Sequence, residues 1–157
     1  MRKTLGYMVT FTTYGTWLQG DERGWVQEGI IYEENEELHN VNESNLKGEV
    51  VRLKKREKEI VGEAICRKAE ARGEKILAIS VWSSHVHIVQ RYGRRPMEEA
   101  VRIYKNTASA ALRRNGFEGK VWTRGYDKRF CFSERELRAR VDYVNKHGVR
   151  KSIGICP

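Results

Sequence analysis

Two histidines one residue apart, His85 and His87, are the side chains in this chain best suited to chemistry. They lie in WSSHVHIVQ, a run that predicts a β-strand, and on a strand the side chains of residues i and i+2 point to the same face. A second pair, Tyr143 and His147, lies four residues apart in RARVDYVNKHG, which predicts a helix, where this spacing also shares a face. The pattern indicates a metal ion held by imidazoles beside a tyrosine.

A divalent ion beside a phenol favours attack on a phosphate by tyrosine, the chemistry of a nuclease or a strand transferase. Each residue also has a plainer interpretation. A lone strand histidine is more often structural, Tyr143 could be a core aromatic beside Val141 and Val144, and His147 could cap the helix C-terminus through the helix dipole. Two histidines at i and i+2, with a third beside a tyrosine, favour metal ligation over these alternatives.

Basic side chains are concentrated in the second part of the sequence. The chain has 30 Lys and Arg against 21 Asp and Glu, a net charge of +9. Residues 1–90 hold 13 basic and 14 acidic side chains, whereas residues 91–157 hold 17 basic and 7 acidic. This asymmetry favours a nucleic-acid partner over simple solvation of exposed faces. The candidate DNA-binding residues are Lys105, Arg113, Arg114, Arg124, Lys128 and Arg129. The tryptophans that could stack on unpaired bases, although a core position is their commoner fate, are Trp17, Trp25 and Trp122.

The cysteines and the hydropathy pattern indicate the cellular compartment of the protein. Cys66, Cys131 and Cys156 are widely spaced and odd in number, which argues against a disulfide framework and favours a reducing cytoplasm. The N-terminal residues lack the apolar core of a signal peptide, and no stretch is apolar enough to span a bilayer. We therefore expect a cytoplasmic protein with no membrane partner.

The first half of the chain predicts one strand, a long excursion and one helix. GYMVTFTTY at 6–14 is rich in β-branched and aromatic residues and predicts a strand. Glycines interrupt residues 15–29, and residues 31–43 are acidic and predict an irregular surface segment. An apolar stripe predicts a helix from about Asn45 to Arg72, which a glycine then ends.

The second half predicts a hairpin and two helices. Two apolar runs, 76–84 and 85–92, are joined by a short polar turn, which places His85 at the start of the second strand. Pro96 is suited to the first turn of a helix that runs to about Asn115 and is closed by a glycine.

The remaining residues predict two short strands and a last helix. The strands lie at 121–122 and 129–133, on either side of a turn. Ser133 predicts the N-cap of the last helix, with Glu136 completing a capping box and Gly148 ending it. The order β, long loop, α, β, β, α, β, α favours an α+β sandwich, an antiparallel sheet covered by helices, in a single domain of residues 1–157.

Four sequence blocks resemble a known family. WSSHVHIVQ resembles the HUH motif (histidine, hydrophobic residue, histidine) of single-strand DNA transferases. TTYGTWLQGDERGWV, IYKNTASAALRRN and VDYVNKHG resemble single-tyrosine HUH transposases, and in particular the REP-associated tyrosine transposases and their insertion-sequence relatives. The blocks occur in family order, and the resemblance covers most of the chain apart from residues 31–43.

This resemblance implies a ferredoxin-like fold and metal-dependent cleavage of single-stranded, hairpin-forming DNA. His85 and His87 match the metal-binding histidines, and Tyr143 matches the nucleophile that forms a 5′-phosphotyrosine link. His147 stands where the family commonly has a glutamine ligand. The expected cofactor is a divalent ion, Mg or Mn, with Ni or Zn as further candidates, because three imidazoles favour borderline metals over Mg.

Three questions stay open at the level of sequence. The chain could be a domesticated protein that binds DNA hairpins without transposing anything. It could also be a metal phosphodiesterase in which water attacks and Tyr143 is structural. A homodimer is compatible with the sequence, and the tyrosine helix could then serve its own chain or the partner.

Overall fold

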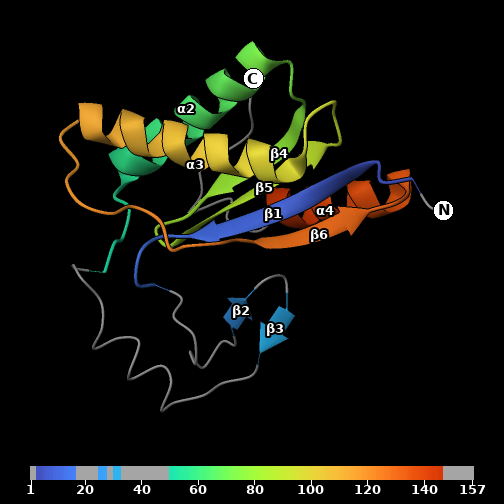
Figure 1. The fold of residues 1–157 in the computed structure, drawn as a ribbon, viewed down its shortest axis with the longest axis horizontal. Coiled ribbons are helices and arrows are strands. Elements are labelled where there is room, and N and C mark those ends of the chain that lie inside the picture. Colours follow the sequence, from blue (N-terminus) through green and yellow to red (C-terminus); the bar gives the residue numbers. More distant parts are fainter. Residues whose placement is uncertain (1–2, 17–24, 28–29, 33–49, 147–157) are drawn as a thin grey trace.

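A computed structural model describes residues 3–16, 25–27, 30–32 and 50–146 (Figure 1). Most of the predicted acidic segment, 31–43, lies outside these residues, as do His147 and Gly148. Within the described part, β2 (Trp25–Gln27) and β3 (Ile30–Tyr32) pair as a small antiparallel sheet. The long excursion predicted after the first strand therefore contains a short pair of strands.

The principal sheet has four antiparallel strands in the order β4-β5-β1-β6. Apart from the β2–β3 pair, the described elements run β-α-β-β-α-β along the chain, followed by one more helix, which is the predicted α+β sandwich with a ferredoxin-like arrangement. The elements are β1 (Gly6–Thr12), α2 (Lys55–Arg72), β4 (Ile76–Val81), β5 (His85–Arg91), α3 (Met97–Arg114), β6 (Asp127–Cys131) and α4 (Glu134–Lys146).

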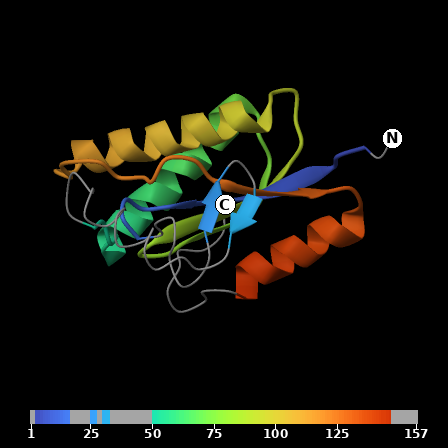
Figure 2. The same ribbon diagram turned by 60° about the horizontal axis from the view of Figure 1, so that its bottom comes forward.

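The two faces of this sheet are covered by different helices. Helices α2 and α3 lie side by side on one face, and α4 crosses the other (Figures 1 and 2). Alternation along β1 divides the side chains between two cores: Tyr7, Val9 and Phe11 join the α2–α3 core, whereas Met8 joins the α4 core with Val144. The sheet is therefore buried on both sides, and any site on it must lie at an end or beside the short helix α4.

Helix α2 begins at Lys55, so the described residues 50–54 are not helical, contrary to the sequence prediction, and the predicted helical residues 45–49 lie outside the description. Instead of continuing the helix, the amide of Val51 donates to the Tyr14 carbonyl at 2.8 Å and the amide of Leu53 donates to the Ser83 carbonyl at 2.8 Å. The first helical turn is closed by the Glu57 carboxylate, which accepts from the Lys54 amide at 2.8 Å. Long-range backbone pairing thus replaced the helical hydrogen bonds that the apolar stripe alone predicted.

The other boundaries agree closely with expectation. The hairpin β4–β5 forms as predicted, Pro96 directly precedes α3, and Gly73 ends α2 in a left-handed conformation with φ of 72°. Residues 121–122 contribute only an isolated bridge, between Trp122 and Thr13.

The last strand and helix differ from the prediction in detail. Strand β6 begins two residues before the predicted 129–133. At the start of α4 the Glu136 amide donates to the Ser133 hydroxyl at 3.1 Å, as a capping residue requires. The Glu136 carboxylate accepts from the Phe132 amide rather than from that of Ser133, so the capping box is shifted by one residue.

The cysteines are not all thiols. Cys66, on α2, is disulfide-bonded, which the odd number of cysteines did not predict. Cys131 is a free thiol in the α4 core, and burial raises its pKa. Among the described residues no helix is long and apolar enough to cross a membrane.

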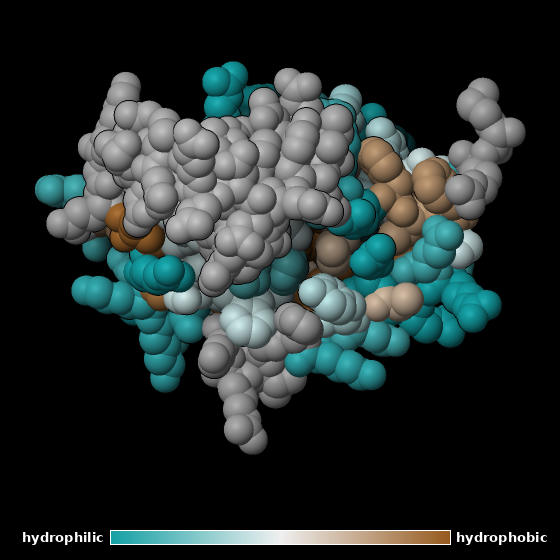
Figure 3. Space-filling view, turned by 90° about the horizontal axis from the view of Figure 1, so that it is seen from below, coloured by the Kyte–Doolittle hydropathy of each residue, from teal (hydrophilic) through white to brown (hydrophobic). Residues whose placement is uncertain are grey.

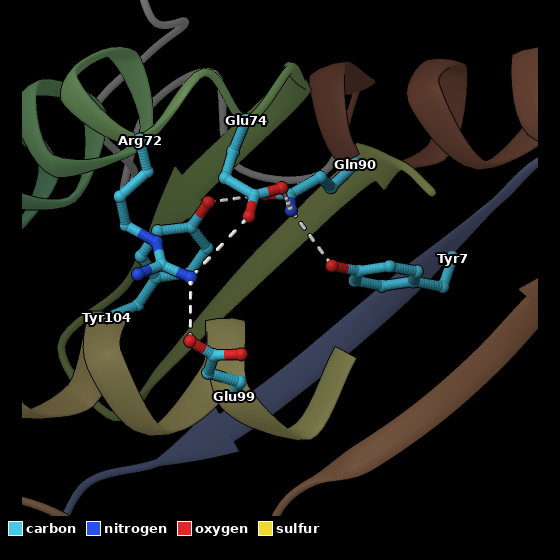
Figure 4. A network of polar contacts seen from close by, with 6 residues as sticks. All are labelled: Tyr7, Arg72, Glu74, Gln90, Glu99 and Tyr104. Atoms are coloured by element: carbon cyan, nitrogen blue, oxygen red, sulfur yellow. Dashed lines mark hydrogen bonds and ion pairs between the residues drawn. The ribbon is translucent and has the colours of Figure 1, made fainter. Parts of the chain in front are cut away.

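A polar network crosses the α2–α3 core (Figure 4). The Tyr104 hydroxyl donates to Gln90 Oε1 at 2.6 Å, and Gln90 Nε2 donates to the Tyr7 hydroxyl at 2.9 Å and to the Glu74 carboxylate at 3.0 Å. Arg72 lies 3.6 Å from the same carboxylate. Burial raises the pKa of both tyrosines, so they are neutral donors and acceptors at ordinary pH. The network ties β1, β5 and α3 together through one buried amide.

Replacing Tyr104 by Phe removes the only hydroxyl that this network offers Gln90 Oε1. We predict that Tyr104→Phe lowers the free energy of unfolding by about 1–3 kcal/mol, because a buried acceptor loses its partner. Chemical denaturation measures the change. Tyr92→Phe is the matched control, since Tyr92 is exposed and its loss of a hydroxyl should cost less than about 0.5 kcal/mol. Equal effects of the two substitutions would contradict a stabilising role for the network.

Candidate active site

His85 and His87 lie together on the α4 face of the sheet, as the strand spacing predicts. Their neighbours Val86 and Ile88 point into the α2–α3 core, so the two imidazoles project from the opposite side. The ring centroids are 4.7 Å apart and the rings meet edge to face. His87 is only 8% exposed, and His85 is half-buried at the first position of β5.

Each imidazole contacts a hydroxyl through the same ring nitrogen. The Nδ1 atom of His87 lies 2.7 Å from Thr10 Oγ1, and the Nδ1 atom of His85 lies 2.9 Å from Ser84 Oγ. The face of the His85 ring stacks on the Trp82 ring, with the centroids 5.4 Å apart and an angle of 13° between the planes. Both rings are thus fixed by side chains that sequence reasoning did not select.

Tyr143 lies beside these histidines rather than in the core. Helix α4 is anchored by Leu137 and Val144, each 1% exposed, whereas Tyr143 is 42% exposed. Its ring centroid is 6.0 Å from that of His87, with the planes at 72°. The alternative in which Tyr143 is a core aromatic is therefore not supported.

The described residues bring two of the three predicted metal ligands together. His147 lies outside them and directly follows Lys146 in the sequence. Within the ranges that the structure describes, no three His, Cys, Asp or Glu side chains form a group that could hold a metal ion. Two adjacent imidazoles fit a divalent ion as part of its ligand set, because neutral imidazole is a common ligand of such metals.

Strand β6 adds charged residues to the histidine face. In the register of the sheet, Thr10 of β1 has His87 as its partner on one side and Asp127 on the other. The Asp127 carboxylate pairs with Arg129 at 3.4 Å. Arg124 is exposed and lines a small cavity of about 50 Å³ with Thr10 and Asp127. Arg129, the register partner of Met8, is thus the predicted DNA-binding residue that the fold brings to the histidine side of the sheet, and Arg124 lies near the end of that face beside Thr10 and Asp127.

The other predicted DNA-binding residues lie elsewhere. Arg113 and Arg114 are exposed in the last turn of α3, which covers the opposite face of the sheet. Lys128 points to the opposite face of β6 from its neighbour Arg129. Its Nζ lies 5.9 Å from the centroid of the Phe130 ring. Seen from below, both hydrophilic and hydrophobic side chains are visible on the described surface (Figure 3). The basic half of the sequence is therefore divided between two faces of the fold.

Lys105 makes contacts within the protein. Its ammonium group donates to the carbonyls of Thr123 at 2.9 Å and Gly125 at 3.0 Å. Burial, with a smaller contribution from Lys120, lowers the pKa of Lys105 to about 8. Its contacts fix the segment that carries Arg124, and a contact with phosphate stays a prediction.

Trp122 occupies the core instead of a surface where bases could stack. Its indole donates to the Lys105 carbonyl at 3.0 Å, and its ring packs edge to face on Phe11 with the centroids 4.8 Å apart. Trp17 and the side chain of Trp25 lie outside the description. Trp82, which stacks on His85, is the tryptophan that lies next to the histidine pair. No pattern in the sequence distinguishes it from the other three tryptophans.

Comparison with known proteins gives one informative result. No family model and no curated protein match this chain. Among solved structures, the chain is similar to a REP-associated tyrosine transposase bound to a REP hairpin, with a TM-score of 0.57 and 15% sequence identity. The similarity covers 94% of this chain and 72% of that one. At this level of identity the comparison shows a shared fold.

Proposed function

We propose that this protein cleaves and rejoins single-stranded DNA with Tyr143 as the nucleophile and a divalent ion held by His85 and His87. The observation that carries the proposal is the position of an exposed tyrosine 6.0 Å, between ring centroids, from a histidine pair whose own rings are 4.7 Å apart. Solvent exposure of Tyr143 lets a polymer reach it, and the sheet gives the two imidazoles a fixed geometry.

In the proposed reaction the Tyr143 oxygen attacks a backbone phosphorus. The bond from phosphorus to the 3′ oxygen breaks, a 5′-phosphotyrosine link forms, and the phenolic proton is balanced by protonation of the released 3′ oxygen. The covalent link conserves the energy of the phosphodiester, so a different 3′-hydroxyl can reverse the step without a nucleotide cofactor. A bound divalent ion supplies Lewis-acid stabilisation of charge at the phosphate.

The proposed ligands are His85, His87 and His147. Two strand imidazoles hold their nitrogens on one side of the sheet, and a residue just beyond α4 is close in sequence to Tyr143. An all-imidazole set favours Mn, Ni or Zn over Mg, since Mg prefers oxygen and keeps its water.

The proposed substrate is a single strand that forms hairpins. The solved structure with the same fold contains a REP hairpin, and the net charge of +9 suits a polyanion. We propose Arg129, on the histidine face, and Arg124, beside Thr10 and Asp127, as the basic residues that contact phosphates. An unpaired strand suits the site because its backbone can bend toward a half-exposed tyrosine.

The nucleophile assignment predicts that Tyr143→Phe abolishes the covalent protein–DNA adduct while leaving DNA binding and folding intact. The substitution removes one oxygen and nothing else. Incubation with labelled hairpin-bearing single strands and Mn²⁺, followed by a denaturing gel, detects the adduct. Tyr92→Phe, at another exposed tyrosine, is the control and should form adduct normally. Persistence of the adduct in Tyr143→Phe would show that another residue attacks, and cleavage by wild type without any adduct would favour attack by water.

The ligand assignment predicts that His87→Ala and His147→Ala each weaken Mn²⁺ binding at least tenfold in calorimetric titration. Loss of one of three protein ligands leaves a weaker two-imidazole site. His39→Ala, at the remaining histidine of the chain, should bind as wild type does. Unchanged affinity in His147→Ala would mean that His147 is not the third ligand.

The placement of the basic residues predicts different effects for Arg124 and Arg113. Arg124→Ala should weaken binding to single-stranded DNA and reduce the slope of log affinity against log salt by about 1, because one phosphate contact is lost. Arg113→Ala, on the opposite face, should leave both values nearly unchanged. A larger effect at Arg113 would place the DNA on the α2–α3 side instead.

A further inference from the structure

We infer that Thr10 and Ser84 are positioning residues that hold His87 and His85 in the tautomer with the proton on Nδ1, so that each ring presents Nε2 to the metal. This inference rests on the proposed function for its purpose. A neutral imidazole has one N–H and one acceptor nitrogen, and only the acceptor can bind a metal. The direction of the hydrogen bond at one ring nitrogen therefore decides which nitrogen carries the lone pair.

Thr10 is well placed to control His87. The two residues are direct partners in the pairing of β1 with β5, and β1 is itself held between β5 and β6. Both side chains are less than a tenth exposed and their polar atoms lie 2.7 Å apart. Bulk water has little access to this pair, and a threonine hydroxyl can either donate to Nδ1 or accept from it. The proposed direction is from Nδ1–H to Thr10 Oγ1. With Nδ1–H donating to Thr10 Oγ1, Nε2 bears the lone pair that a metal needs.

Ser84 makes the corresponding contact with His85, and its own position is fixed. The Ser84 carbonyl accepts from the Thr13 amide at 2.8 Å, and the Thr16 hydroxyl lies 3.1 Å from the same oxygen. The Ser84 hydroxyl is then 2.9 Å from His85 Nδ1, while Trp82 stacks against the face of the ring. The turn between β4 and β5 thus supplies both a hydroxyl partner at Nδ1 and an aromatic ring that packs against the face of this imidazole.

A third hydroxyl on the same face provides a contrast. Ser80 of β4 is the partner of His87 on the side away from Thr10. Its hydroxyl is buried and has no hydrogen-bond partner among the described atoms. Proximity of a hydroxyl to the histidine is therefore not enough, and the specific contact at Nδ1 distinguishes Thr10 from Ser80.

The tautomers are measured directly by long-range ¹H–¹⁵N NMR of the metal-free protein, at a pH where both imidazoles are neutral. In wild type we expect His85 and His87 to carry the proton on Nδ1. Thr10→Val keeps the branched shape but removes the hydroxyl, and should move His87 toward the Nε2–H form. Ser84→Ala should do the same for His85. Thr10→Ser, which retains a hydroxyl, and Ser80→Ala should leave the wild-type tautomers.

Calorimetric titration with Mn²⁺ gives the second readout. Loss of a partner of this kind weakens metal binding by about 10- to 100-fold, so we expect this loss in Thr10→Val. Thr10→Ser and Ser80→Ala should stay within about threefold of wild type. A change in Thr10→Val that left the tautomer of His87 unaltered would point to a merely structural effect and overturn the inference.

The spectrum of the wild-type protein tests the tautomer of His87 even if Thr10→Val fails to fold. If His87 carries its proton on Nε2 in the metal-free protein, Thr10 is the donor and the inference is wrong. The proposed function fails separately, by absence of a Tyr143 adduct. An adduct with Nε2–H tautomers would refute only the positioning role, and Nδ1–H tautomers without an adduct would refute only the nuclease.

Discussion

The register between β1 and β5 is the constraint on which the candidate site depends. Side chains on a strand alternate between faces, so a slip of one residue in this pairing would turn both histidines toward the α2–α3 core. The register is fixed because β5 is buried on both sides: Val86 and Ile88 fill one core and Val89 fills the other. The apolar residues between and beyond the histidines therefore determine where the imidazoles point.

The second constraint is the close approach of α4 to the sheet. A Cβ atom on Gly6 would lie 2.6 Å from the Gln90 carbonyl and 2.8 Å from Leu137 Cδ1, so only glycine allows this packing. Leu137 and Val144 then hold the helix, and Tyr143, next to Val144, is carried to the histidines without being buried itself. The arrangement combines a rigid pair of imidazoles with an accessible phenol, which suits a polymeric substrate better than a small molecule enclosed in a pocket.

Sequence alone predicted the features that depend on local periodicity. The strand spacing of His85 and His87, the hairpin that carries them and the glycine at the end of α2 follow from rules that act within a few residues, and all three are confirmed. The start of α2 was missed because the amides of Val51 and Leu53 pair with distant carbonyls. Thr10 was missed for the same reason: 77 residues separate it from His87, and no local pattern gives the register between strands so far apart.

The basic residues show most clearly that side chains grouped in the sequence can lie on different faces of the fold. The basic half of the chain suggested one polyanion surface, yet α3 and β6 direct its members to opposite sides of the sheet. Lys105 is held by the carbonyls of Thr123 and Gly125, and the cost of burying its charge is evident in a pKa lowered to about 8. Those two carbonyls belong to the residues before and after Arg124, so the partly buried Lys105 holds the backbone on both sides of an exposed cation. The basic residues of this half of the sequence therefore do not have one common role: Lys105 supports the backbone of a neighbouring segment, whereas Arg113, Arg114 and Arg124 are exposed.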